Sequence, residues 1–314
     1  MTSSVKVYIK KHIPVCIWNW LKIVKIIILG KSFSSVWQAQ VPVVVPKDSC
    51  HSKKISILCS IWNLDLNILQ QTLDSVFIQT YPHWELCINC CCDATRTDIL
   101  DLLQEYAKKD ARIILSRNKN AGIAENTNIA AKLATGDYIC LLDHDDLLSP
   151  NALYYLLNAA ENEQADLVYA DEYYLFMKPA QRCLIRHKGP YELSSLRKTN
   201  YINHPVLISR NLFDKIGGIR SGFEGSQDYD LYLRITEYTN KISYVPKPLY
   251  FWRIHYNSFS QKRIDICIKS GKKALEEHYK RSGLAIKVTP SGESAIYLSI
   301  PENKSFIISQ KQEN

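Results

Sequence analysis

A short apolar run that ends in four polar residues constrains the fold of this 314-residue chain more than any other segment. Residues 138–142 (Tyr-Ile-Cys-Leu-Leu) are typical of a strand that is buried on both faces of an α/β sheet. Asp143, His144, Asp145 and Asp146 follow directly, and the strand must end there because unpaired charge is costly to bury. Since side chains alternate along a strand, Asp143 and Asp145 are predicted to leave it on the same side.

This acidic strand end has two interpretations. Ligands of open α/β sheets bind outside the carboxyl ends of the strands, and two carboxylates suit Mg²⁺ or Mn²⁺, which complete their coordination with phosphate oxygens and water. Alternatively, the acidic residues form a turn before the next helix, with Ser149 at its N-cap and Pro150 at its first position. Capping by Ser149 leaves the acidic cluster unexplained, but the residues alone leave both interpretations open.

Apolar runs and helical periodicities alternate through the first half of the chain and predict a doubly wound, mostly parallel sheet with helices on both faces. The predicted strands are 55–59, 84–88, 112–115, 138–142 and 167–170, and the predicted helices are 64–79, 97–107, 130–133 and 150–162. Residues 172–203 break the alternation; they are polar, aromatic and irregular, which indicates a binding region. Further predicted elements are strands at 204–209 and 242–245 and helices at 229–237 and 274–279.

The positive charge of the chain is concentrated at its beginning. Residues 1–54 contain nine Lys and one acidic residue, Asp48, so they account for the whole net charge of +8. The remaining residues, 55–314, are therefore neutral, which argues against a nucleic-acid-binding groove in the body of the protein.

The basic leader also contains a mostly apolar stretch, residues 13–29, which Lys22 and Lys25 interrupt. It is short for a bilayer span, and no small-residue cleavage site follows it. Trp and Lys among aliphatic residues favour a helix that lies on an anionic membrane surface. A helix packed on the domain or on a partner subunit explains the same pattern.

Ten cysteines are spread irregularly along the chain. Cys90, Cys91 and Cys92 are consecutive, which disfavours pairing among them, and no Cys/His spacing is typical of zinc. The cysteines are therefore predicted to be reduced thiols of a cytosolic protein.

Three motifs occur in a fixed order: 141–146 (Leu-Leu-Asp-His-Asp-Asp), 223–231 (Phe-Glu-Gly-Ser-Gln-Asp-Tyr-Asp-Leu) and 250–255 (Tyr-Phe-Trp-Arg-Ile-His). Together they resemble the family-2 glycosyltransferases of the GT-A fold, particularly the bacterial enzymes that build cell-surface polysaccharides. Residues 81–88 and 200–204 strengthen the resemblance, which covers about residues 54–285. Each motif is weak by itself, but five in register are specific.

The resemblance implies an inverting, hexosyl- or rhamnosyl-type transfer of a sugar from a nucleotide-diphosphate donor to an acceptor hydroxyl. In the Asp-x-Asp pattern, Asp145 would ligate Mn²⁺ or Mg²⁺ and Asp143 would lie near the metal or the donor ribose. His255 would be a further metal or phosphate ligand, Asp228 the general base, and Glu224 an assisting or acceptor-positioning residue. By the same resemblance, the other donor-binding residues would be Ser60, Trp62, Asn63, Asp93 and Asn128, and the acceptor residues would be Asp171, His204 and Gln227.

Independent chemistry agrees with the two central roles. A divalent cation stabilises the charge that develops on a departing diphosphate, and a hydroxyl needs a positioned carboxylate to accept its proton as it attacks. Asp228 has the alternative role of an acid at a helix N-terminus, favoured by the helix dipole. His255 alone would be an ordinary surface or hydrogen-bonded histidine.

Several positions depart from the family pattern, and all of them lie in the donor half. Cys90-Cys91 stands where the family carries an Asp-Asp pair that recognises the donor base, and a thiol accepts hydrogen bonds poorly. Asp93 is a candidate substitute, while Ser60 and Trp62 replace the usual Pro and Tyr. These departures raise a second hypothesis, a nucleotide-sugar-binding or scaffold protein of the same fold without catalysis. A nucleotidyltransferase would need a Gly-rich basic loop, which residues 55–66 lack.

The predicted organisation has three parts: a leader and linker (1–54), a GT-A domain (55–285) and a C-terminal tail (286–314). The domain would comprise a nucleotide-sugar half (55–171), an acceptor and catalytic half (172–260) and a closing helix (261–285). The expected partners are a nucleotide sugar and a glycan or lipid-linked glycan, and no nucleic acid. The expected location is the cytoplasm, with peripheral contact through residues 1–40 to the inner face of the cell membrane.

Overall fold

The computed structural model describes residues 29–43, 52–177, 181–254, 262–292 and 295–301. Two predictions fall outside these ranges. His255 lies outside the described residues, and so does all of the apolar stretch 13–29 except Leu29. Their proposed roles in metal binding and membrane contact stay predictions.

The first half of the body is a regular alternation of parallel strands and helices, as the sequence predicts. Strands β5, β2, β3 and β4 lie in that order and all pair in parallel. The bounds of these elements are β2 (Ile55–Ile61), α4 (Leu66–Phe77), β3 (Trp84–Cys90), α5 (Thr97–Lys109), β4 (Ile113–Arg117), α6 (Ile123–Leu133) and β5 (Tyr138–Leu141). The helix predicted at 130–133 is longer than expected and begins at Ile123.

The second half extends the same sheet with strands of both directions. Its elements are β6 (Leu147–Leu148), α7 (Ala152–Asn162), β7 (Leu167–Phe176), β8 (Arg182–Arg186), α8 (Leu193–Leu196), β9 (Val206–Ser209), α9 (Arg210–Lys215), α10 (Gln227–Ile235), β10 (Ile242–Ile254) and α12 (Ile264–Arg281). Strand β9 is antiparallel to β5 and β7, whereas β10 is parallel to β7. The carboxyl ends of β2, β3, β5, β7 and β10 therefore point to one edge of the sheet.

Three sequence-based expectations are wrong in this half. The irregular region 172–203 contains the end of β7 and the antiparallel strand β8. The run after 242–245 continues as one long strand, because register shifts on either side of Pro248 accommodate the proline. Helix α7 is not capped by Ser149: its N-cap is Asn151, and the Ser149 hydroxyl donates to Gln40 Oε1 instead (2.9 Å). The acidic turn therefore does not serve to cap this helix.

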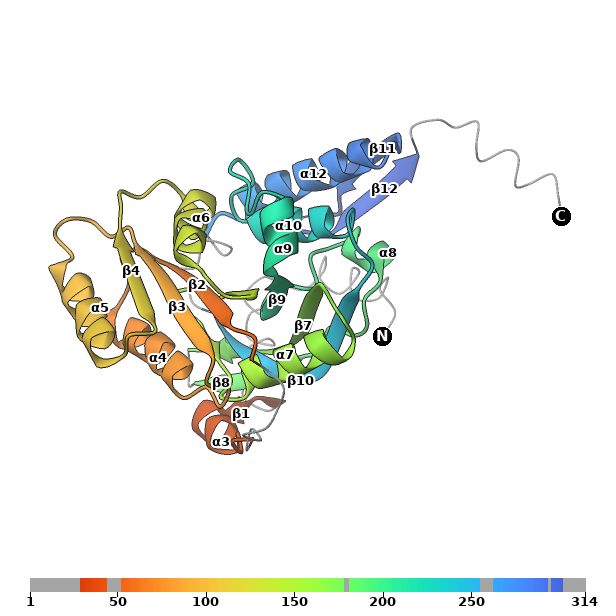
Figure 1. Ribbon diagram of the computed structural model, residues 1–314. Coiled ribbons are helices and arrows are strands. Elements are labelled where there is room, and N and C mark those ends of the chain that lie inside the picture. The colour runs from red at the N-terminus through yellow and green to blue at the C-terminus, as the bar shows by residue number, and fades with distance from the viewer. Residues whose placement is uncertain (1–28, 44–51, 178–180, 255–261, 293–294, 302–314) are drawn as a thin grey trace, which may run out of the picture.

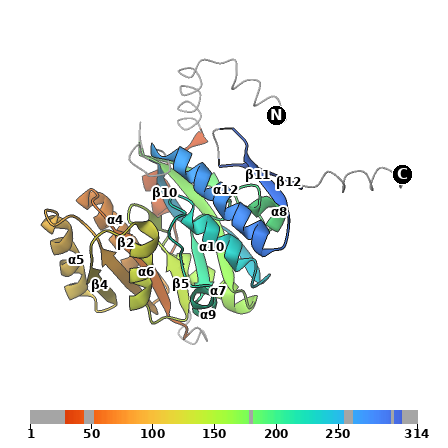
Figure 2. The same ribbon diagram turned by 90° about the horizontal axis from the view of Figure 1, so that it is seen from above.

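Two short additions flank the body. Residues 29–43 form an N-terminal arm, with β1 (Lys31–Ser32) on the edge of β8 and α3 (Phe33–Gln38) packed beside it. Strands β11 (Ile286–Pro290) and β12 (Tyr297–Pro301) form a separate antiparallel ribbon within the predicted tail. Figures 1 and 2 show the ribbon next to α12, on the side of the molecule away from α4 and α5. No helix in the described ranges is both long enough and apolar enough to cross a bilayer.

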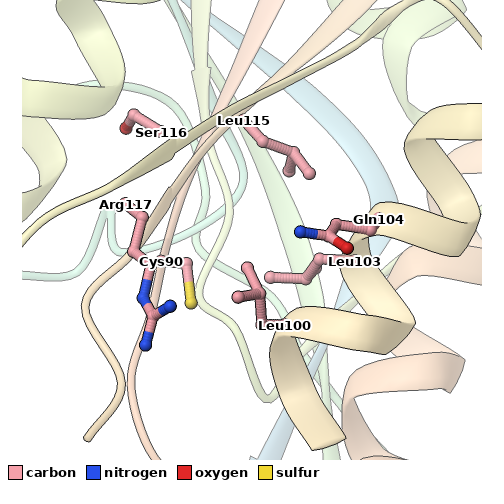
Figure 3. A pocket seen from close by; sticks show the side chains of 7 residues that line it. All are labelled: Cys90, Leu100, Leu103, Gln104, Leu115, Ser116 and Arg117. Carbon is pink, nitrogen blue, oxygen red and sulfur yellow. The ribbon is translucent and has the colours of Figure 1, made fainter. Parts of the chain in front are cut away.

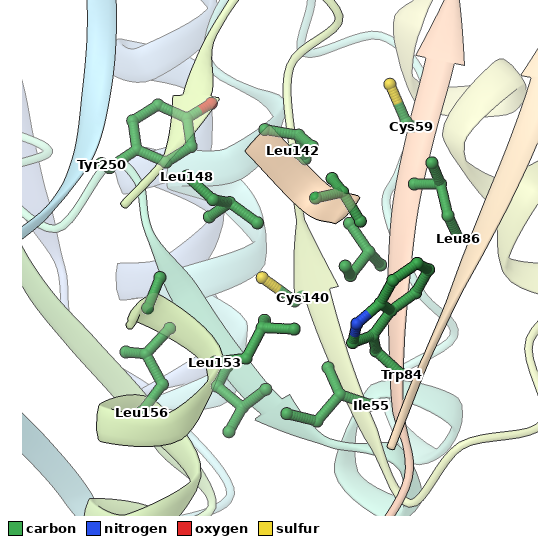
Figure 4. Close-up of a cluster of buried hydrophobic side chains, with 14 of the residues drawn as sticks. Ile55, Cys59, Trp84, Leu86, Cys140, Leu142, Leu148, Leu153, Leu156 and Tyr250 are labelled. Atoms are coloured by element: carbon green, nitrogen blue, oxygen red, sulfur yellow. The ribbon is translucent and has the colours of Figure 1, made fainter. Parts of the chain in front are cut away.

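Apolar side chains on the two faces of the sheet form two separate cores. One face packs against α4, α5 and α7, and its residues include Ile55, Trp84, Cys140, Leu153 and Tyr250 (Figure 4). The other face packs against α6, α9, α10 and α12 (Figure 1). Burial on both faces explains why the parallel strands are continuous apolar runs. The sheet is thus a rigid base for the loops at its carboxyl edge.

Candidate active site

The acidic residues after β5 are held in a turn by the end of β10. The Asp143 N–H donates to the Tyr250 hydroxyl (3.2 Å). The buried Asp146 carboxylate accepts a hydrogen bond from the Arg253 N–H (2.8 Å). Two motifs that lie about a hundred residues apart in the sequence therefore form one unit in space.

The Arg253 side chain makes a second link between these segments. It is 1% exposed, and it donates from Nη1 to the Asp145 carbonyl oxygen (2.5 Å) and from Nη2 to Gln71 Oε1 (2.6 Å). Burial lowers the pKa of this guanidinium, whereas the negative charges of Asp146 and Asp145 oppose that shift. Arg253 therefore fixes the backbone of the acidic turn and compensates part of its charge.

A pocket at the carboxyl edge of the sheet brings together residues from both halves of the chain. Its polar lining residues are Ser60, Thr127, Asp143, His204, Gln227 and Asp228. Its apolar lining residues are Leu58, Ile123, Leu141, Leu142 and Ile219. The predicted donor-side carboxylate and the predicted general base thus face the same space, although 85 positions separate them in the sequence.

Asp228 lies in the first turn of α10, where the N–H group of Tyr229 helps to stabilise its negative charge. The Asn200 amide donates from Nδ2 to Asp228 Oδ2 (2.8 Å). Burial and the charge of Asp143 raise the pKa of the Asp228 carboxyl, while His204, the Tyr229 N–H and Asn200 oppose the rise. A carboxylate whose pKa is raised toward neutrality is a stronger base than an ordinary Asp.

His204 lines the pocket together with the two carboxylates. Its Nε2 is 3.6 Å from Asp143 Oδ2, and its ring is 5.4 Å from the Tyr250 ring. Burial lowers the pKa of the imidazole, and the charge of Asp228 opposes this. The buried Nδ1 has no hydrogen-bond partner in the described part of the chain, which leaves a polar atom available to a ligand.

The residues of the acidic turn fit a divalent cation. Partial burial and the neighbouring charge of Asp145 raise the pKa of Asp143 to about 6, although 55% of its side chain is exposed. Burial and the charges of Asp145 and Asp143 also raise the pKa of Asp146. This mutual repulsion is what a bound cation would relieve. Within the described ranges, no three His, Cys, Asp or Glu side chains form a complete metal cluster, so the remaining ligands would come from phosphate, water or residues outside those ranges.

The other predicted donor residues lie around the ends of β2 and β3. Ser60 Oγ is 3.5 Å from Thr127 Oγ1. Asn63 and Asp93 pair with each other: the Asn63 amide donates to the Asp93 carboxylate, and the Asp93 N–H donates to Asn63 Oδ1 (3.1 Å). Trp62 is 49% exposed beside them. These side chains form a polar and aromatic rim next to the pocket.

Asn128, a predicted donor-binding residue, is hydrogen-bonded to the backbone of the pocket wall. Its amide binds the backbone of Ile219 in both directions, from Nδ2 to the carbonyl oxygen (2.7 Å) and from the Ile219 N–H to Oδ1 (3.0 Å). Ile219 lines the pocket and Asn128 does not. Asn128 therefore ties α6 to the wall of the pocket.

Two further predicted residues do not line the pocket. Asp171 is fully buried and accepts hydrogen bonds from Tyr244 Oη (2.6 Å) and from the Lys188 N–H (2.8 Å), with the His187 ring also at 2.8 Å. Glu224 is exposed, and its Oε1 accepts from the Gly222 N–H (2.9 Å). The contacts of Asp171 are those of a residue that holds the scaffold.

Three residues that we did not single out have direct roles in the geometry: Asn200, Tyr250 and Arg253. All three belong to motifs that carried the resemblance. Their function was missed because a motif shows which residues belong together, whereas only the fold shows that Asn200 contacts Asp228 and that Arg253 contacts the acidic turn.

The family model for glycosyl transferase family 2 matches residues 56–223, which is more than half of the chain. The chain belongs to this family. An uncharacterised protein of Sinorhizobium fredii is 34% identical over 73% of the chain and 26% of that protein. The O-antigen biosynthesis protein RfbC of Myxococcus xanthus is 32% identical over 75% of the chain and 19% of that protein. This family-2 chain thus spans only about a fifth to a quarter of the length of these two relatives.

Solved structures establish the fold of this family-2 chain as GT-A. S. aureus TarS in complex with UDP-GlcNAc superposes with a TM-score of 0.57 and 14% identity, covering 70% of this chain and 65% of that one. The mannosyltransferase of Pyrobaculum calidifontis in complex with GDP-Man and Mn²⁺ has a TM-score of 0.56 and 16% identity, covering 79% of this chain and 69% of that one. At such identities the likeness concerns the fold and not the substrate.

Proposed function

We propose that this family-2 chain is an inverting glycosyltransferase that moves a hexosyl or rhamnosyl group from a nucleotide-diphosphate sugar to a hydroxyl of a growing glycan or lipid-linked glycan. The observation that carries the proposal is the common pocket of Asp143, His204 and Asp228. Inverting transfer needs charge stabilisation on one side of the anomeric carbon and a base on the other. Carboxylates from two separate motifs flank this pocket.

In this mechanism Asp228 accepts the proton of the acceptor hydroxyl while the oxygen attacks the anomeric carbon. Asn200 holds one carboxylate oxygen of Asp228, and the other oxygen would accept the proton. Asp143 and Asp145 would hold Mn²⁺ or Mg²⁺, with His255 as a further ligand. When bound, the cation supplies positive charge to the departing diphosphate. Ser60, with Trp62 and the Asn63–Asp93 pair beside it, would contact the nucleoside.

The acceptor would approach from the side of α10. Gln227 lines the pocket, and its buried Oε1 has no hydrogen-bond partner within the described ranges. Such an atom is available to a hydroxyl of the acceptor. His204, with its unpaired Nδ1, offers a second polar contact on the same side. Glu224 would contribute to acceptor binding from the exposed loop before α10.

The test is the release of nucleoside diphosphate from a panel of nucleotide sugars, with Mn²⁺ and candidate acceptors. Asp228→Asn should lower turnover by about 10²-fold or more, because a general base contributes roughly 10²–10⁴-fold. Asp101→Asn, on the exposed face of α5, is the matched control and should retain full turnover. Equal turnover by the Asp228 variant and the control would contradict the assigned base.

The second candidate function is a catalytically inactive nucleotide-sugar-binding or scaffold protein. It is motivated by Cys90 and Cys91, which are both 2% exposed and stand where the family carries carboxylates. This alternative predicts metal-dependent binding of a nucleoside diphosphate without turnover on any donor and acceptor. The same panel, read by calorimetry in parallel, distinguishes it from the enzyme.

We also propose that the basic leader contacts the inner face of the cell membrane. The experiment must spare the N-terminal arm (29–43), since Phe33 and Trp37 pack against Phe251. Deletion of residues 1–28 should therefore lower the fraction that cosediments with anionic vesicles, while turnover on a soluble acceptor is unchanged. Equal cosedimentation of the full chain and the truncated chain would refute membrane contact through this segment.

A further inference from the structure

A buried lysine outside the pocket lining holds the segment 200–204. The Lys188 side chain has no exposed surface. Its Nζ atom donates to the carbonyl oxygen of Ile202 (2.6 Å) and to that of His204, and it lies 3.0 Å from Glu172 Oε2. Three oxygen atoms therefore surround an ammonium group that has three N–H groups.

Both ends of this segment belong to the candidate active site. Asn200 donates to the Asp228 carboxylate, and His204 lines the pocket. Asn203, between them, has a φ of +43°, in the left-handed region that is uncommon for residues other than glycine. Such a conformation persists only where the surrounding contacts enforce it. Lys188 supplies two of these contacts, because it binds the carbonyl oxygens on either side of Asn203.

The contacts of Lys188 depend on its charge. Without its proton the amine has two N–H groups and a lone pair, so one of the three surrounding oxygens would face that lone pair. Glu172 would also lose one of its two cations, the other being Arg186 (2.8 Å). Burial lowers the pKa of Lys188 to about 8; the charge of Arg186 adds to this shift, and those of Glu172 and Asp171 oppose it.

The other charged and titratable side chains around Lys188 come from several elements. They are Asp171 and Glu172 of β7, Arg186 and His187 at the end of β8, His204 of the segment, Tyr232 of α10 and Tyr244 of β10. Burial lowers the pKa of His204, and it raises the pKa of Tyr244 to about 12 and that of Tyr232 still further. These three side chains therefore keep their charge state around pH 8.

We propose that Lys188 is a positioning residue whose ammonium group holds segment 200–204 in its active conformation. With the proton in place, Asn200 is held against Asp228 and His204 is held in the pocket. Without the proton, the segment relaxes and the base loses its support. The effect on transfer rests on the proposed function, whereas the effect on the segment does not.

The pH profile of kcat/KM with saturating Mg²⁺ tests the effect on transfer. The native chain should show a basic limb near pH 8. Lys188→Arg should lose this limb, because a guanidinium is not deprotonated in proteins. Lys188→Met should also lack the limb, and its kcat/KM below pH 8 should fall by up to about 10²-fold, the cost of a misplacement of about 1 Å. A limb near pH 8 that persists in Lys188→Arg would overturn the proposal.

A matched variant changes the same segment without changing a charge. Tyr232 Oη donates to the Asn203 carbonyl oxygen (2.8 Å), so Tyr232→Phe removes a neutral contact from the segment. This variant should lower kcat/KM and leave the basic limb in place. Disappearance of the limb in Tyr232→Phe would show that the limb does not report the charge of Lys188, and would refute the proposal.

A second control concerns thiols, which also titrate near this range. Figure 3 shows Cys90 in a separate pocket with Arg117 and two leucines of α5. This pocket shares no lining residue with the candidate active site, so Cys90→Ser should keep the basic limb. Loss of the limb in this variant would assign it to the thiol and would also refute the proposal.

Hydrogen exchange of the substrate-free chain at pH 7 tests the effect on the segment. The amides of residues 200–204 should exchange faster in Lys188→Met than in the native chain, and by a larger factor than the amides of β2. Lys109→Met, on the surface of α5, should match the native chain. Unchanged exchange of the segment in Lys188→Met would overturn the proposal. Faster exchange there, with no turnover by the native chain on any donor, would refute the proposed function instead.

Discussion

The hydrogen bond between Asn200 and Asp228 makes a quantitative prediction about the pH dependence of transfer. Asn200 Oδ1 is oriented by the Asn203 N–H (3.4 Å), so Nδ2 faces the Asp228 carboxylate at 2.8 Å. This bond stabilises the charged form of Asp228 and lowers its pKa, against the effect of burial. Replacing Asn200 with Ala should therefore raise the pKa of the base, so that a larger fraction is protonated and inactive at low pH.

The size of the effect follows from the strength of such a bond. A hydrogen bond to a charged group contributes about 1.5–3 kcal/mol, and the partly open pocket favours the lower end. Because one pKa unit corresponds to about 1.36 kcal/mol, the acid limb of kcat/KM should move upward by roughly one pH unit. Well above that limb the base is charged in both proteins, so their kcat/KM values should converge.

The assay is the pH profile of kcat/KM for Asn200→Ala beside the native chain, with saturating Mn²⁺. Asn158→Ala, an amide replacement on α7 away from the pocket lining, is the matched control and should leave the profile unchanged. An equal loss of kcat/KM at every pH, with the acid limb unmoved, would show that Asn200 only positions the loop. That result would refute the assignment of the acid limb to a base held by Asn200.

Three further predictions concern stability. Asp143→Asn should raise Tm at pH 7.5 without metal and leave it unchanged near pH 4. The reason is that a carboxyl with a folded pKa of about 6 destabilises the protein where it is charged. The variant should also lose the Mn²⁺-dependent rise in Tm. Lys188→Met should lower the free energy of unfolding in urea by about 3 kcal/mol, because Lys188 is buried 3.0 Å from Glu172; Lys109→Met, on the surface, should cost little. Trp37→Ala should cost about 2 kcal/mol and leave KM for the donor unchanged, since Trp37 packs on Phe251 at 5.3 Å outside the pocket lining.

Local sequence was sufficient to predict the first half of the fold. Each parallel strand there is buried on both faces, so its apolar run is continuous, and each helix has its own periodicity. Asp65 even caps α4, accepting from the Asn67 N–H (2.8 Å). These signals lie within single segments, which is why the alternation and most element boundaries agree with the structure.

The second half depended on contacts that no local pattern contains. Residues 172–176 continue β7 because they pair with β8 on one side and with β10 on the other. Tyr173 and Leu175 are buried there in a cluster with Val36 of the arm and Phe251 of β10. The sequence between Asp171 and His204 is polar and aromatic, which indicated an irregular region. The apolar residues that cover its strands come from distant segments, so no local pattern could show those strands.

The candidate site shows the same division between what a motif and a fold can reveal. The motifs pointed to Asp143 and Asp228, which the fold brings to one pocket. They also pointed to Asn128, and only the fold shows that its amide is hydrogen-bonded on both sides to Ile219. Arg253 presents the opposite case, a buried cation with no assigned role that holds the Asp145 carbonyl. A residue of a motif either contacts the substrate itself or holds in place the segment that contacts the substrate. Side chains with unused hydrogen-bonding atoms within the described ranges, such as His204 and Gln227, are available to contact substrate. Substitution of these residues should change KM before it changes stability.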